Sequence, residues 1–210
     1  SYIKNKNAEK EYNAVIARYT EIGRNLEVAE DVINTIAKDI YDRFSLYSGN
    51  DKKFIDLMKA AGEDNSAKLV AGYLQSLGVE ATYVNPKDAG LVLSSEFGNA
   101  QVLPESYKNL SSLKDIPGII VFPGFFGYSR EGDVVTFSRG GSDITGSILA
   151  AALDADLYEN FTDVDCIYSV NPSIISNPYP IKEITYKEMR ELSYAGFSVF
   201  HEEALVPVYL

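Results

Sequence analysis

The sequence predicts an α/β protein, a three-layer α/β/α sandwich around a mainly parallel sheet. Two observations carry this prediction. Segments with helical apolar spacing alternate with short strand-like segments, and the run GIIVFPGFFG at 118–127 begins like a buried strand of a parallel sheet. The chain has 210 residues, enough for one good hydrophobic core or two small ones. We expect a helical pair at 1–46 and an α/β core at 47–210 that carries the substrate and nucleotide sites.

The N-terminal part is predicted to be helical. Apolar residues recur at helical spacing from about 11 to 26 and again from 28 to 44, with a turn at 23–25. One or two further helices are predicted over 52–77, and Gly78 is expected to end them as a C-terminal cap.

The rest of the chain mixes predicted strands and helices. A helix is expected in the Ala-rich segment after Ser142, and another at 186–197. Apolar or alternating segments predict strands at 79–84, at 118–127, at 133–137, at the beginning of 156–164, and at 167–170.

Composition and charge exclude several classes of protein. The chain has 30 acidic and 19 basic side chains, a formal net charge of −11, and no basic cluster, which argues against nucleic acid and anionic membranes as partners. One cysteine, Cys166, excludes an internal disulfide framework and a Cys-rich zinc site, and it fits a reducing cytoplasm. No apolar run approaches the roughly 20 residues of a membrane span, and the polar start is unlike a signal peptide.

Chemistry concentrates in FSRGGSDITGS, residues 137–147. Ser142 or Asp143 is expected to cap the following helix, whose N-terminus offers free N–H groups and a positive dipole end. The two glycines let an anion approach the backbone, and Arg139 adds a fork that matches a carboxylate or phosphate. The stretch lacks the lysine of a P-loop, and GxGxxG does not occur in the chain. A capped turn without function is the alternative, and the carboxylate of Asp143 counts against it.

Two other stretches support a site. Glu63 follows a glycine in AAGEDNSAKL at 60–69, where a solvated helix charge is the alternative. The segment NFTDVDCIYSVNPS at 160–173 holds a Thr-Asp pair, a Tyr and an Asn-Pro turn, where a polar loop is the alternative. Turns at the carboxyl edge of a sheet are where α/β folds place ligands.

Taken in order, four stretches resemble the aspartokinases of the amino acid kinase family over about residues 60 to 206. They are GEDNSAKLVAGYL, PGFFGYSREGDVVTFSRGGSDITGSILAAAL, NFTDVDCIYSVNP and EMRELSYAGFSVFHEEAL. The resemblance implies a partial amino acid kinase domain over 1–210. It also implies ATP-dependent phosphorylation of the β-carboxylate of L-aspartate to 4-phospho-L-aspartate, the entry step to lysine, threonine and methionine synthesis. Mg²⁺ would offset the phosphate charge, and the intact enzyme would be a cytoplasmic homodimer.

The resemblance also assigns site residues, with no metal ligand among them. Asp143 would be catalytic. His201 also matches a family position, but on the residues alone we expect both His201 and Cys166 to be structural. The residues that would hold aspartate are Glu63, Arg139, Gly140, Gly141, Ser142 and Asp143. The residues that would line the nucleotide site are Thr162, Asp163, Tyr168, Ser169, Val170, Asn171, Pro172 and Ser173.

Three departures from the family pattern matter. The family's phosphate-gripping Lys-Phe-Gly-Gly motif does not occur, so we expect the fold to be incomplete at its N-terminus and this truncated chain to be inactive. Asn171-Pro172-Ser173 replaces the family's Asp-Pro-Arg, and the regulatory ACT domains would follow Leu210. Two alternatives stay open, a kinase of glutamate or acetylglutamate and a non-catalytic ligand-binding or regulatory fragment.

Overall fold

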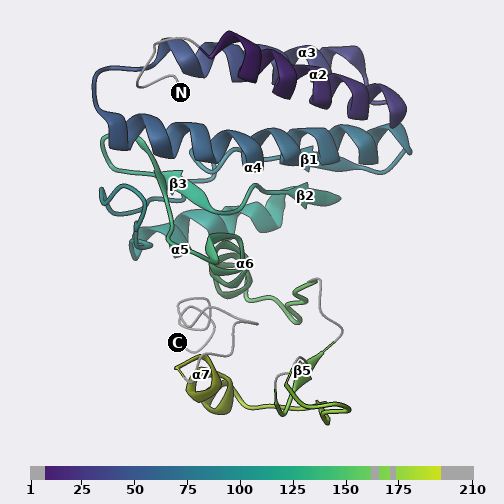
Figure 1. Ribbon diagram of the computed structural model, residues 1–210, viewed down its shortest axis with the longest axis vertical. Helices are drawn as coiled ribbons and strands as arrows, with labels where there is room; N and C mark the ends of the chain where they lie inside the picture. The colour runs from purple at the N-terminus through teal and green to yellow at the C-terminus, as the bar shows by residue number, and fades with distance from the viewer. Residues whose placement is uncertain (1–7, 162–165, 171–173, 195–210) are drawn as a thin grey trace.

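The outermost layer is a pair of helices, α2 (Glu9–Asn25) and α3 (Glu30–Ser45), seen at the top of Figure 1. The structure is a computed structural model that describes residues 8–161, 166–170 and 174–194. Both helices follow the predicted apolar spacing, but the chain turns at 26–29, where Glu27 has a φ of 56°. Gly23 stays helical, and it lets α3 come close, because a Cβ there would lie 2.8 Å from the Ile33 side chain.

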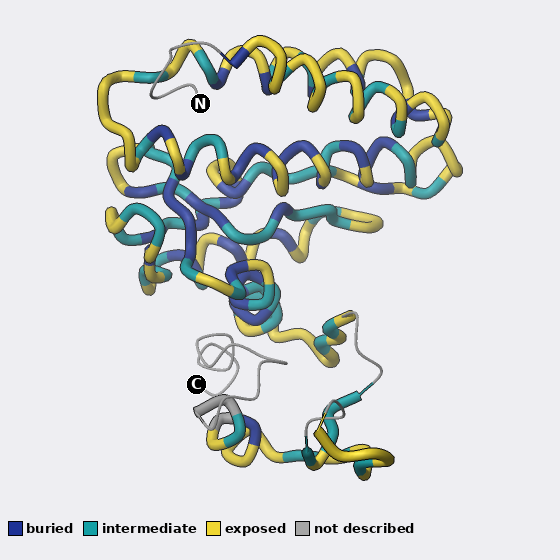
Figure 2. The backbone as a smooth tube through the Cα atoms, viewed as in Figure 1, coloured by how far each residue is buried: buried dark blue, intermediate teal, exposed yellow. Residues whose placement is uncertain are grey.

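The central element is a single long helix, α4 (Asp51–Ser76). Its N-terminus is capped by the Asn50 side chain, which accepts a hydrogen bond from the backbone N–H of Lys53. Its end is followed by Gly78 with a φ of 77°, which confirms the predicted glycine cap. Buried residues occur all along α4 in Figure 2, because the helix packs between α3 and the strands.

The described strands pair as three short ladders. Strand β1 (Ala81–Tyr83) is parallel to β2 (Ile119–Val121), whereas β3 (Phe126–Tyr128) is antiparallel to β4 (Val134–Thr136) and β5 (Ile167–Tyr168) to β6 (Pro180–Ile181). The α/β class is therefore confirmed, with shorter strands than the sequence indicates.

Two strand predictions need correction. In β2, Ile119 is 47% exposed, so this apolar run is not fully buried, because β1 is the one strand that pairs with β2 in the described ranges. The segment 156–161 forms no strand. Its side chains still alternate, with Leu157 and Phe161 exposed and Tyr158 partly buried, but no described strand lies beside it to form a ladder.

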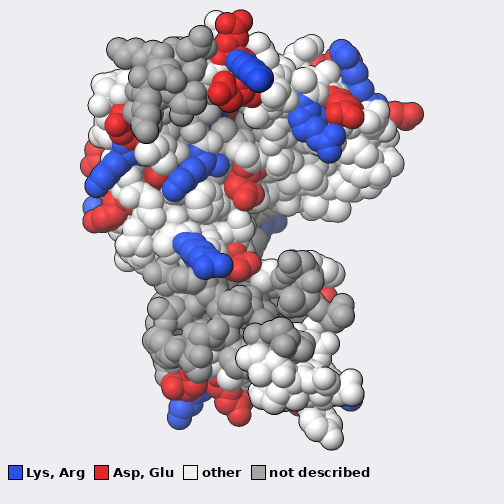
Figure 3. Space-filling model, in the orientation of Figure 1, with Lys and Arg blue, Asp and Glu red and all other residues white. Residues whose placement is uncertain are grey.

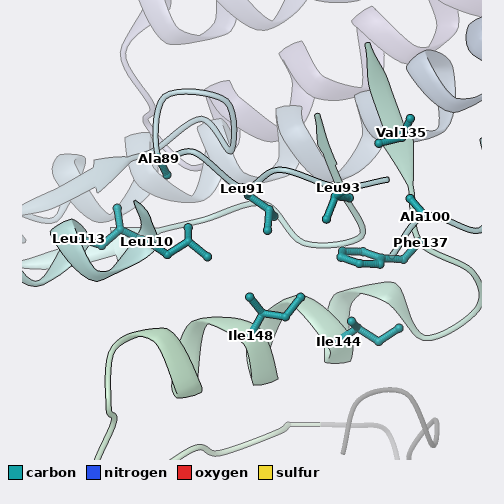
Figure 4. Packing of buried hydrophobic residues seen from close by; sticks show 10 residues of the cluster. All are labelled: Ala89, Leu91, Leu93, Ala100, Leu110, Leu113, Val135, Phe137, Ile144 and Ile148. Atoms are coloured by element: carbon teal, nitrogen blue, oxygen red, sulfur yellow. The ribbon is translucent and has the colours of Figure 1, made fainter. Parts of the chain in front are cut away.

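The main hydrophobic core lies between the strands and a lower helical layer (Figure 4). That layer contains α5 (Glu105–Leu110), the short 3₁₀ helix η1 (Ser111–Asp115) and α6 (Gly141–Ala152). The last described helix, α7 (Tyr186–Tyr194), begins at a capping box. The ten buried members of the core are Ala89, Leu91, Leu93, Ala100, Leu110, Leu113, Val135, Phe137, Ile144 and Ile148. Within the described ranges, no helix combines the length and apolarity needed to cross a membrane.

A buried carboxylate fastens β4 to α4. Asp56 is 2% exposed, and its Oδ2 accepts hydrogen bonds from the backbone N–H groups of Gly98 and Thr136, at 2.8 and 2.9 Å. One turn earlier on α4, Lys53 forms a 2.5 Å ion pair with Asp133, which precedes β4. Strand β4 therefore runs along α4 in the direction of the helix.

A second set of charges joins α3 to α4, and we call it the buried ion-pair cluster: Asp39, Arg43, Asp64 and Lys68. The Arg43 Nε lies 2.7 Å from Asp39, and its Nη2 lies 2.6 Å from Asp64. The Lys68 Nζ lies 2.9 Å from Asp64. Two cations face two anions, so the cluster is neutral as a whole, as a buried set of charges must be to avoid a large desolvation cost.

The cluster predicts a pH dependence of stability. Burial alone would raise the pKa of Asp39, but hydrogen bonding and the charge of Arg43, with Lys68 and Asn65, outweigh burial and hold this pKa below its ordinary value. Such a carboxyl stabilises the fold above the unfolded pKa of about 4, and the contribution is lost as the pH falls through the folded pKa. We expect the free energy of unfolding, measured with urea between pH 3 and 7, to fall at the acidic end. Asp39→Asn should flatten this fall, and an equal slope in both proteins would contradict the assignment.

Candidate active site

The start of α6 is built around a glycine. Gly140 precedes the first helical residue in a left-handed conformation, with a φ of 79°, which a side chain would strain. The expected caps, Ser142 and Asp143, are wrong, because neither side chain forms a capping hydrogen bond to this helix. Both residues lie inside the first turn, past the position from which a side chain caps. Among the described residues, the first N–H groups of α6 therefore have no side-chain acceptor.

Arg139 stands directly before this helix start. Its side chain is exposed, and no hydrogen bond or ion pair joins it to another residue of the described ranges. Elsewhere on the surface, basic and acidic side chains are interspersed in Figure 3, and Arg18, Arg24 and Arg130 each have an acidic partner. A fixed cation beside free N–H groups and a positive dipole end is a site for an anion.

The loop after β2 packs tightly on the same helix start. A Cβ at Gly124 would lie 2.9 Å from the Cα of Ser142, and one at Gly141 would lie 2.8 Å from both the Phe137 Cβ and the Phe125 ring. Phe125 has a φ of 74°, which is uncommon for a residue with a side chain.

Two hydrogen bonds hold this strained backbone in place. The Phe125 N–H donates to the Thr145 Oγ1 at 3.1 Å, and the Phe137 N–H donates to the Phe125 carbonyl at 2.9 Å. The loop and the helix start are thus fixed to each other before any ligand binds.

Asp143 has one polar neighbour that sequence reasoning missed. The Asn160 Nδ2 donates to its Oδ1 at 3.3 Å, which leaves Oδ2 without a described partner. Tyr158 lies over the same turn, because its hydroxyl donates to the Asp143 carbonyl at 3.4 Å and would be 2.5 Å from a Cβ at Gly146. Burial, followed by the negative charge of Asp143, raises the pKa of Tyr158, so this phenol stays protonated near pH 7. The alternation of side chains at 156–161 could have indicated that Tyr158 and Asn160 face α6, but the same alternation predicts a strand.

Glu63 lies on α4 rather than on the loop and helix described above. It is exposed, no partner is found among the described residues, and partial desolvation raises the pKa of its carboxyl. Seven residues at about 100° each bring Glu63 to within about 20° of the direction of Asp56, two turns further along. Asp56 binds the backbone of β4, so Glu63 also projects from the side of α4 that faces β4. Arg139 follows β4 in the chain.

The predicted nucleotide stretch is described in part. Tyr168 is in β5, and Ser169, next to it, donates its N–H to the Tyr179 carbonyl. Figure 1 shows this ladder below α6, apart from the helix start. Val170 is partly buried, whereas Thr162, Asp163 and 171–173 lie outside the described residues, as does His201. Cys166 is half-buried and free.

Comparisons with known proteins agree with one another. A model of the amino acid kinase family matches residues 4–209. Aspartokinase 3 of Bacillus subtilis is 57% identical over 208 residues, which is 99% of this chain and 46% of that protein. The aspartokinase of Mycolicibacterium smegmatis is 37% identical over 69% of this chain and 35% of that protein. The chain therefore spans about half the length, or less, of these relatives.

Solved structures show the same likeness. Clostridium acetobutylicum aspartate kinase superposes with a TM-score of 0.76 at 35% identity, covering 99% of this chain and 44% of that one. E. coli aspartokinase III in complex with aspartate and ADP gives a TM-score of 0.77 at 25% identity, covering 97% of this chain and 48% of that one.

Proposed function

The chain belongs to the amino acid kinase family, and on this premise we propose that it is the part of an aspartate kinase that holds the acceptor amino acid. The reaction is the ATP-dependent phosphorylation of the β-carboxylate of L-aspartate to 4-phospho-L-aspartate. The observation that carries the proposal is Arg139, an exposed cation without a described partner, at a glycine-built helix start with Asp143 in its first turn. The likeness to a structure in complex with aspartate and ADP supports it.

The reaction requires positioning of the substrates and neutralisation of their charge, but no general base to remove a proton from the acceptor. A side-chain carboxyl with a pKa of about 4 is already ionised at pH 7, so no proton has to be removed from it. One oxygen of the β-carboxylate attacks the γ-phosphorus of ATP, the bond between that phosphorus and the β,γ-bridging oxygen breaks, and ADP leaves with the electron pair. Catalysis of such a transfer is mostly orientation and electrostatic stabilisation.

The proposed site has a positive part for a carboxylate of aspartate and a negative part for its ammonium group. Arg139 and the N–H groups of Gly141 and Ser142 would take a carboxylate of aspartate, with Gly140 allowing close approach. Asp143 and Glu63 would face the ammonium group. This pairing would lower the raised pKa of Glu63 on binding.

The nucleotide would lie along the segment that follows Asn160. Thr162 and Asp163 would line its site, and Tyr168, Ser169 and Val170, with 171–173, would wrap the adenosine and phosphates. Mg²⁺ would be carried mainly by phosphate oxygens, because it is usually bound through one or two carboxylates together with substrate phosphates. In the described ranges, no three His, Cys, Asp or Glu residues come together as a metal site.

The setting of the enzyme is part of the proposal. A cytoplasmic homodimer in lysine, threonine and methionine synthesis fits the single cysteine and the aspartokinase relatives. Light scattering of the full-length protein tests the dimer, and a monomeric mass at all concentrations would contradict it.

A coupled assay of ADP release tests the proposed reaction. The full-length protein is given Mg·ATP with L-aspartate, L-glutamate or N-acetyl-L-glutamate in turn. We expect turnover with aspartate alone. Turnover with glutamate or acetylglutamate but not with aspartate would show that aspartate is not the substrate. Calorimetric binding of both ligands without ADP release would instead support a non-catalytic ligand-binding protein.

The contact between Asn160 and Asp143 makes a further prediction. Asn160→Leu keeps the approximate volume of the side chain but removes the amide that orients the Asp143 carboxylate. We expect the KM for aspartate to rise about tenfold, as for the loss of one hydrogen bond to a charged group, with the KM for ATP nearly constant. Asn160→Asp is the contrasting variant, because a second carboxylate would repel Asp143. An unchanged aspartate KM in Asn160→Leu would show that the contact does not orient Asp143.

A further inference from the structure

Asp64, the residue after Glu63, is among the most constrained side chains of the molecule. It is 2% exposed, and its Oδ2 receives hydrogen bonds from Arg43 and Lys68 at 2.6 and 2.9 Å. Its Oδ1 receives a hydrogen bond from the Tyr83 hydroxyl. Burial, followed by the hydrogen bond to Asp64 and its charge, raises the pKa of Tyr83, which therefore remains a donor. Asp64 is thus held from α3, from α4 itself and from β1.

The same stretch of α4 is held on its other sides. The Gly62 carbonyl accepts a hydrogen bond from the Tyr19 hydroxyl of α2 at 3.0 Å. Asp56 binds the backbone of β4 at 2.9 Å. Successive residues of a helix point about 100° apart. Contacts to α2, to β4 and to the α3 and β1 side therefore fix the rotation of α4 about its axis, and with it the direction of Glu63.

Stability alone does not explain such a cluster. Buried ion pairs often contribute no more to stability than apolar residues of the same volume, because desolvation offsets their attraction. They differ from apolar contacts in geometry, since a carboxylate with three donors accepts one arrangement, whereas apolar side chains repack after a small rotation. A cluster beside the exposed carboxylate of Glu63, which has no partner among the described residues, therefore fits a role in orientation.

We propose that Asp64 is a positioning residue, which fixes the rotation of α4 through the buried ion-pair cluster so that Glu63 faces the ammonium group of the acceptor. The inference rests on the proposed function, because it takes Glu63 to contact the amino acid. Asp64 itself does not touch the substrate.

Asp64→Asn in the full-length protein tests this role, because it preserves the shape of the side chain and removes its charge. We expect the KM for aspartate to rise about tenfold, as for a displacement of a binding group by a fraction of an ångström, with the KM for ATP nearly unchanged. Ile36→Val is the matched control, since it weakens the same helical layer without moving a charge. Assays are run well below the melting temperature of each variant, so that unfolding does not enter the kinetics.

A double-mutant cycle separates positioning from a merely structural role. If Asp64 acts through Glu63, the effect of Asp64→Asn disappears in a Glu63→Gln background. A full tenfold effect in that background, or none in the wild-type background, would overturn the inference. If Asp64→Asn does not fold, Tyr83→Phe replaces it, since it removes one donor and keeps all charges. It should raise the KM for aspartate two- to threefold, and only when Glu63 is present. Failure of the wild-type protein to phosphorylate aspartate would instead overturn the proposed function.

Discussion

Arg139→Ala is expected to lower kcat/KM for aspartate by about 30-fold or more in the full-length protein. Removing one partner of a desolvated charge pair costs about 2 to 5 kcal/mol, and each 1.4 kcal/mol is a factor of about ten. The side chain has no described partner in the free protein, so its loss should leave the fold almost unaffected. Steady-state kinetics in aspartate, with the thermal midpoint of the same sample, measures both effects.

The specificity of this effect is checked with the nucleotide and with a conservative change. Calorimetry should give nearly the same affinity for Mg·ATP in Arg139→Ala as in the wild type. Arg139→Lys keeps the charge and loses the fork, so we expect an intermediate kcat/KM. An unaltered KM for aspartate in Arg139→Ala would remove this residue from the acceptor site.

Arg43→Met is expected to cause the largest loss of stability, about 3 to 5 kcal/mol, because it leaves the carboxylate of Asp64 buried with a reduced set of donors. The change also removes the hydrogen bond from Nη1 to the Leu57 carbonyl. Urea unfolding at pH 7 gives the free energy directly.

Two further variants test whether an unpaired buried charge causes the loss of stability in Arg43→Met. Arg18→Met breaks an exposed ion pair with Glu21 on α2 and should change stability very little. Arg43→Met combined with Asp64→Leu removes both charges, and we expect it to recover much of the loss. A double variant as unstable as Arg43→Met would mean that packing, rather than an unpaired buried charge, causes the effect.

Local patterns in the sequence predicted secondary structure correctly where a segment determines its own conformation. The apolar spacing of Tyr12, Ile16 and Tyr19 predicted α2, and Gly78 predicted the end of α4, because helical periodicity and a positive φ are local properties. The prediction of a side-chain cap at α6 was wrong because Gly140, which has no side chain, occupies the capping position, and Ser142 and Asp143 lie inside the first turn. The strand predicted at the beginning of 156–164 does not form over 156–161, because a strand also requires a neighbour, which no local pattern specifies.

The site shows the same division between local and distant information. Arg139 to Asp143 could be found because they are consecutive. The contact of Asn160 with Asp143, and of Asp64 with Arg43 and Tyr83, depends on packing between elements. In the sequence, Asp64 is one more charge on a polar helix, and its burial becomes visible only when α3 and β1 lie against it.

The bond from the Thr136 N–H to Asp56 spans 80 residues of sequence, and this separation has a consequence for the order of folding. Helices α2, α3 and α4 are consecutive, so their contacts close short loops at little entropic cost, whereas the link to β4 closes a long one. We expect the three helices to gain protection from hydrogen exchange first during refolding, and β4 later. Pulse labelling tests this order, and simultaneous protection of both parts would contradict it. The surface of α4 that carries Glu63 would then form before the segment that carries Arg139 is folded.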